Sequence, residues 1–81
     1  MKEIGKVSHY YDKIGVAIID LAGKLAVGDR VKFQSSNLEF EQEVSSMQID
    51  HEQVEKAGKG KVVGIKVDKK VHQGTVVYKV E

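Results

Sequence analysis

The side chains that could carry chemistry are few and scattered in this sequence. His9, His51 and His72 lack the paired spacing with which two imidazoles of one element hold a metal ion. No serine stands in a Gly-x-Ser-x-Gly turn, and residues 58–61 (GKGK) lack the spacing of a phosphate-binding loop. There is no cysteine, and therefore no thiolate nucleophile or disulfide. We therefore expect a protein that is not an enzyme, with no metal site, no cofactor and no nucleotide of its own.

Length and composition indicate one small domain. The 81 residues are 41% hydrophobic and 31% charged, which is ordinary for a globular chain and too short for two cores. Residues 1–81 are thus expected to form a single domain. No apolar run approaches the roughly 20 residues that a bilayer requires, and the N-terminus lacks the pattern of an export signal. We expect a cytoplasmic protein that does not contact a membrane.

Charge is segregated along the chain, although the formal net charge is only +1. Every charged side chain between Ser35 and Glu55 is acidic. From Lys56 onward, seven lysines face only Asp68 and Glu81. The simpler interpretation is that these are solvated strand faces that prevent edge-to-edge pairing. The functional alternative is a lysine-rich docking surface.

Short stretches of alternating apolar and polar residues, rich in β-branched side chains, predict half-buried strands. We predict six strands, at 3–10, 14–21, 30–34, 38–49, 61–67 and 75–80. The alternation slips near Gly5 and again at Ser45 and Ser46, which predicts two bulges or corners. Two bends in so short a chain favour a closed barrel over a flat sheet. The only helix-like stretch is 50–57, where Asp50 could cap one or two turns.

Five aromatic residues are present, and most of them fit the core pattern. Phe33, Phe40 and Tyr78 fall on the expected inward faces of their strands. Tyr10 and Tyr11 therefore remain as candidate platforms for stacking, and one of the two should be buried.

A long segment resembles a known domain. Residues 44–67 read VSSMQIDHEQVEKAGKGKVVGIKV, which is similar to the second domain of elongation factor Tu and of its archaeal and eukaryotic counterparts. The shared pattern is a hydrophobic-polar-hydrophobic triplet, a histidine–glutamate turn, an alanine and a glycine-spaced run into a strand. Residues 4–7, 25–31 and 73–78 look like further strands of that domain. The resemblance spans nearly the whole chain and is strongest to stand-alone elongation factor-like proteins.

That resemblance implies an all-β fold, a six-stranded Greek-key β-barrel of the translation-factor domain 2 type. In full elongation factors this domain holds the acceptor end of aminoacyl-tRNA, with an acidic residue of the triplet against the terminal adenosine. Gln48 stands at that position here. The implied function is RNA or tRNA binding in translation, with Met47, Gln48 and His51 as a base-contacting rim. Lys59 and Lys61 would then contact phosphates.

A protein-interaction module is the alternative. In that interpretation the chain is an accessory barrel that docks on a partner enzyme or on the translation apparatus through the acidic face of Glu39, Glu41 and Glu43. It predicts a partner with a basic surface and no RNA binding. An enzyme of an unrecognised type is a remote third possibility.

Overall fold

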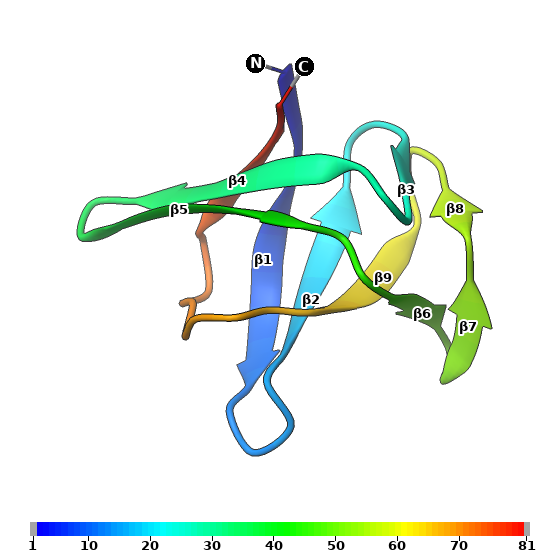
Figure 1. Ribbon diagram of the computed structural model, residues 1–81, viewed down its shortest axis with the longest axis horizontal. Coiled ribbons are helices and arrows are strands. Elements are labelled where there is room, and N and C mark those ends of the chain that lie inside the picture. Colours follow the sequence, from blue (N-terminus) through cyan, green and yellow to red (C-terminus); the bar gives the residue numbers. More distant parts are fainter. Residues whose placement is uncertain (1, 81) are drawn as a thin grey trace.

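The computed structural model describes residues 2–80 as an arrangement of β-strands (Figure 1). They are β1 (Lys2–Tyr11), β2 (Val16–Leu21), β3 (Leu25–Ala26), β4 (Arg30–Ser35), β5 (Leu38–Glu43), β6 (Met47–Ile49), β7 (Glu52–Val54), β8 (Lys56–Ala57), β9 (Val62–Lys66) and β10 (Val76–Lys79). The expected all-β class is confirmed. The predicted strand at 38–49 is divided into β5 and β6, and three strands of two or three residues were not predicted.

The strands form two antiparallel sheets. The larger sheet has the order β5-β4-β10-β1-β2-β9-β6-β7, and the smaller sheet pairs β3 with β8. In Figure 1 the β4–β5 hairpin crosses over β1 and β2. The order leaves β5 and β7 at the two ends of the larger sheet, with no pairing between them among residues 2–80. The closed six-stranded Greek-key barrel therefore stays a prediction.

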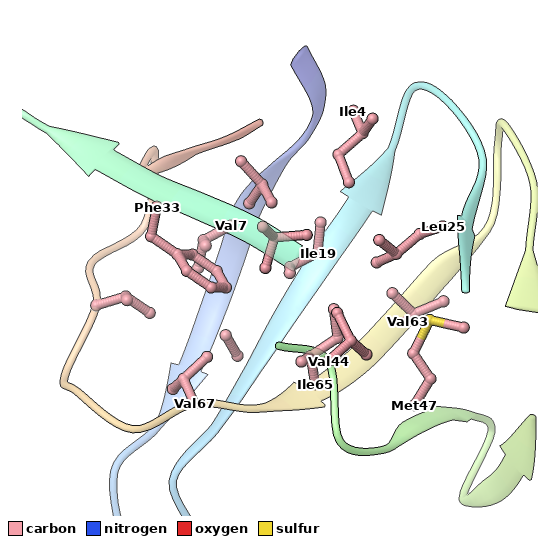
Figure 2. Close-up of a cluster of buried hydrophobic side chains, with 14 of the residues drawn as sticks. Ile4, Val7, Ile19, Leu25, Phe33, Val44, Met47, Val63, Ile65 and Val67 are labelled. Carbon is pink, nitrogen blue, oxygen red and sulfur yellow. The ribbon is translucent and has the colours of Figure 1, made fainter. Parts of the chain in front are cut away.

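The core lies between the β4–β5 hairpin and the strands β1, β2 and β9 (Figure 2). Phe33 and Phe40 oppose each other in the hairpin, and their rings stack with centroids 5.0 Å apart. The alternation of the sequence predicted both as core residues, and both are buried. Tyr78 was expected beside them but is only half-buried. The other buried hydrophobic side chains are Ile4, Val7, Ala17, Ile19, Leu21, Leu25, Val31, Val44, Met47, Val63, Ile65, Val67, Val71 and Val77.

Both predicted bends are present. The register of β1 against β10 shifts between Glu3 and Gly5, so that Ile4 and Gly5 are buried in succession. The second bend lies at 44–46, between β5 and β6, where the chain leaves strand conformation. It turns Val44 and Met47 to the same interior, although their spacing of three would place them on opposite faces of one strand.

The helix predicted at 50–57 is wrong. This segment contains the turn of the β6–β7 hairpin, strand β7 and strand β8. Met47 pairs with Val54 and Ile49 with Glu52, which leaves Asp50 and His51 as a two-residue turn. Tertiary pairing thus overrides a local pattern too short to specify a helix.

Candidate functional site

The structure places Met47 in the core and not on a binding rim. Its side chain is fully buried, and β6 carries it between β7 and β9, where it faces Val54 and Ile65 (Figure 2). The expectation that Met47 contacts a ligand is therefore wrong. Its apolar side chain follows the inward face of β6, while the next residue, Gln48, points outward and is exposed.

Gln48 and His51 border a hollow of about 310 Å³, which we call the apolar groove. It lies where β2, β9 and β6 are neighbours in the sheet and is bordered by the turns after β1 and β6. Its lining is mainly aliphatic, with one tyrosine and three polar residues at the rim. The lining residues are Tyr11, Ile14, Val16, Ile18, Gln48, Asp50, His51, Val62, Val63 and Gly64.

The apolar groove gathers most of the exposed large hydrophobic side chains. Among the described residues four such side chains are exposed, and three of them, Tyr11 (49%), Ile14 (62%) and Val62 (50%), line this groove. The fourth, Val27 (41%), lies elsewhere, beside Ser45 and Ser46. Of the two tyrosines proposed as stacking platforms, Tyr10 packs against the core and Tyr11 is the exposed one.

The turn that carries two rim residues has an unusual backbone. Asp50 and His51 have φ angles of 52° and 67°, and they are the two positive-φ residues other than glycine in the described chain. A two-residue hairpin turn with both φ angles positive favours asparagine or aspartate followed by glycine, because a Cβ is crowded in this conformation. His51 stands where glycine is favoured, and the turn thus presents an imidazole beside the groove at a conformational cost.

Lys59 and Lys61 lie away from the apolar groove, at two other hollows. Lys61 lines a hollow of about 600 Å³, which we call the lysine hollow. Its lining residues are Lys24, Leu25, Ala26, Asp29, Ile49, Lys56, Ala57, Gly58, Lys61 and Lys79. Lys59 lines an adjoining hollow of about 770 Å³, which shares Lys24, Gly58 and Lys79 with the first and adds Lys2. The residues predicted to form one site are thus divided between two surfaces.

Asp29 is the carboxylate that lines the lysine hollow, and it already has hydrogen-bond and ion-pair partners. Asp29 accepts a hydrogen bond at Oδ2 from the backbone N–H of Ala26 at 3.0 Å. The same oxygen lies 3.4 Å from Nζ of Lys79. Within residues 2–80, no ion pair is formed by the lysines Lys24, Lys56 and Lys61.

The face of β5 that carries Glu39, Glu41 and Glu43 has less unpaired negative charge than the sequence alone indicates. Glu39 lies 3.2 Å from Nζ of Lys32, and Glu41 lies 3.1 Å from Nε of Arg30. These pairs cross between β4 and β5, where the register places opposite charges on one face. Two of the three glutamates proposed for docking therefore neutralise neighbours within the same hairpin.

Residues 2–80 hold no group of three or more histidine or acidic side chains arranged to bind a metal ion. No helix in this range is long and apolar enough to cross a membrane. The cytoplasmic location stays a prediction.

Comparison with known proteins gives similarity to peptidases. No protein-family model matches the chain. The sequence is 42% identical over 77 residues, 94% of this chain, to the uncharacterized protease MJ0090 of Methanocaldococcus jannaschii. The match spans only 19% of that protein, so the chain corresponds to about a fifth of its relative's length.

Two solved structures share the fold. One is the C-terminal domain of a Geobacillus thermoleovorans protein assigned to the U32 peptidases, with a TM-score of 0.93 and 19% identity over 99% of this chain and 93% of that one. The selenomethionine variant of the same domain gives a TM-score of 0.91 over 95% and 98%. At this identity the likeness establishes the fold alone.

These findings overturn the resemblance to elongation factors. The similar sequence is that of a protease, and the similar structures are a peptidase C-terminal domain. The predicted translation-related RNA-binding function is therefore wrong. The motif at 44–67 misled because a hydrophobic triplet, a polar turn and a glycine before a strand occur in β-hairpins of many unrelated functions.

Proposed function

We propose that this chain is an accessory domain of a U32-type peptidase and that it docks through the apolar groove on the remaining part of that peptidase. The observation that carries the proposal is the sequence match, which covers nearly all of this chain and a fifth of a protease. Peptide hydrolysis then belongs to the remainder of the peptidase. The shared fold with a domain found at a peptidase C-terminus supports the accessory role.

The apolar groove supports docking through its composition. Exposed apolar side chains are costly when they gather in one place, and such patches mark surfaces that a partner covers. Tyr11, Ile14 and Val62 would be buried at the centre of the contact. Gln48 and His51 would form part of a polar rim, which is the usual anatomy of a protein interface.

The partner that we propose is the rest of a peptidase. The matched segment is only 19% of the similar protease, so most of that protein lies outside it. A domain of this size that occupies a fifth of a longer protein is expected to contact its neighbour through an interface of the kind found between domains. The groove is the described surface with the largest share of exposed hydrophobic side chains.

The test is isothermal titration calorimetry of the chain with the remaining part of a U32-type peptidase from the same organism. The double variant Ile14→Ser/Val62→Ser should weaken binding at least about tenfold, because central apolar contacts carry most of an interface's affinity. Val27→Ser is the matched control, since it removes an exposed hydrophobic side chain outside the groove. Circular dichroism confirms that each variant is folded.

Absence of binding by the unchanged chain would contradict the proposal. Equal losses of affinity in the groove variant and in Val27→Ser would contradict the assignment of the groove.

A further inference from the structure

We propose that the lysine hollow and its neighbour bind an acidic peptide segment. The inference rests on the proposed function, because it names acidic peptides as the class of substrate that this domain would deliver to the peptidase. It rests on a different surface from the docking groove. The two surfaces share no lining residue.

The charge of the lysine hollow selects an anion. Among residues 2–80, four lysines line it against a single carboxylate, and that carboxylate is held by Lys79 and by a backbone N–H. The adjoining hollow adds Lys2 and Lys59, and among residues 2–80 it is lined by no acidic residue. The positive groups converge because the β3–β8 pairing sets Lys56 opposite Ala26. Strand β10 contributes Lys79 from its last position.

The floor of the lysine hollow selects an apolar group beside the anion. Leu25 is buried at the start of β3, and Ala57 of β8 pairs with it directly. Ile49 lines the same hollow and is half-buried. A free inorganic anion would leave this apolar surface unused. A ligand that carries carboxylates and an aliphatic side chain satisfies both the rim and the floor.

A peptide fits this lining better than a nucleic acid does. Proteins that bind single strands place aromatic rings under the bases, and no aromatic residue of the described chain lines either hollow. The two hollows adjoin through Lys24, Gly58 and Lys79, which gives room for a segment of several residues. Glutamate or aspartate side chains would meet the lysines, and a leucine-like side chain would enter over Leu25.

The experiment is fluorescence anisotropy of a fluorescein-labelled peptide of alternating glutamate and leucine, at low and at physiological salt. The chain should bind it, and binding should weaken as salt screens the charges. Two variant peptides separate the contributions: glutamine for glutamate removes the charge, and serine for leucine removes the apolar side chain. Both should bind more weakly than the parent peptide.

A matched pair of protein variants locates the site. Lys56→Gln/Lys61→Gln should weaken binding of the parent peptide about fivefold, from the loss of two charge contacts. Lys66→Gln/Lys70→Gln makes the same change in net charge at exposed lysines outside both hollows, and it should change binding less than twofold.

If the two double lysine variants lost affinity for the parent peptide equally, the assignment of the site to the lysine hollow would be overturned. The proposal would also be overturned if the serine peptide or the glutamine peptide bound as tightly as the parent peptide. Tighter binding of a labelled oligouridylate than of the peptide would overturn it in favour of a nucleic acid. The groove variant Ile14→Ser/Val62→Ser should bind the peptide normally. A failure of docking and a failure of peptide binding are therefore separate results.

Discussion

At position 5 the backbone of β1 passes so close to β2 that no side chain can be accommodated. A Cβ on Gly5 would lie 2.5 Å from the backbone oxygen of Asp20 and 2.9 Å from Cγ2 of Ile19. The contact with the backbone cannot be relieved by a change of rotamer. The glycine is required by this close approach and by the bulge beside it.

We therefore expect Gly5→Ala to lower the free energy of unfolding by about 1–3 kcal/mol, the usual cost of overpacking. Gly58→Ala is the control, because nothing lies within 4 Å of its added Cβ. Chemical denaturation of both variants is the measurement. Equal stability of Gly5→Ala and the unchanged chain would show that β1 and β2 can separate.

Gln42 is a buried polar side chain that joins parts of the chain that do not pair. Its Nε2 donates to the backbone oxygen of Lys66 at 2.9 Å, and its Oε1 accepts from the backbone N–H of Asp68 at 2.9 Å. The amide thus connects β5 at one end of the sheet order with the end of β9.

Replacing this amide by a methionine of similar size should leave both backbone groups without their partner. We expect Gln42→Met to lower the free energy of unfolding by about 1–3 kcal/mol. Gln34→Met, at an exposed position of β4, is the control. Thermal unfolding followed by circular dichroism gives the comparison, and a destabilisation no larger than that of the control would contradict the bridging role.

Sequence alternation predicts the inward side chains well where they are apolar and poorly where they are polar. Phe33, Phe40 and Val44 were expected to point inward and are buried, whereas Gln42, in the same register, was given no role. A glutamine is buried only where hydrogen-bond partners satisfy its amide, and for Gln42 these partners are backbone groups of Lys66 and Asp68. Those partners are far away in the sequence.

Among the elements, the β6–β7 hairpin departs from local preference at one position of its turn. Its turn holds Asp50 and His51 at positive φ, where asparagine or aspartate followed by glycine is favoured, so that His51 is the departure. Such a turn is retained at a cost in stability, and its side chains border the groove that we assign to docking.

The double variant Asp50→Asn/His51→Gly should therefore raise the free energy of unfolding, by about 1 kcal/mol. The same variant should also weaken docking, since it removes His51 from the rim. Lys13→Gly, in the turn after β1, is the control, because Lys13 is outside the set of positive-φ residues and gains nothing from glycine. A less stable double variant would contradict the account of the turn.

Element boundaries were predictable where strands are long and not where they are short. Strands β1, β2, β4, β9 and β10 were each predicted within a few residues, whereas the single strand predicted at 38–49 is divided into β5 and β6. The strands β3, β7 and β8 are too short for a period of two to be visible, and only pairing defines them. The Asp–His turn was taken for a helix start, because aspartate favours both.

For the whole molecule, the candidate surfaces depend on contacts that no local pattern contains. Lys59 and Lys61 were predicted to contact the phosphates of an RNA, and they line two adjoining hollows. Lys24 and Lys79 join them only because β3 pairs with β8 and β10 ends nearby. The groove likewise combines Ile14 with Val62, 48 positions apart in the sequence.

Amide hydrogen exchange tests the central claim most directly, because it locates docking along the chain. The chain is measured alone and with the remaining part of a U32-type peptidase from the same organism. The account predicts slower exchange at residues 14–18, 48–51 and 62–64 in the complex, and little change in the β4–β5 hairpin. Unchanged exchange throughout, or protection confined to that hairpin, would contradict the proposal that this chain docks on a peptidase through the apolar groove.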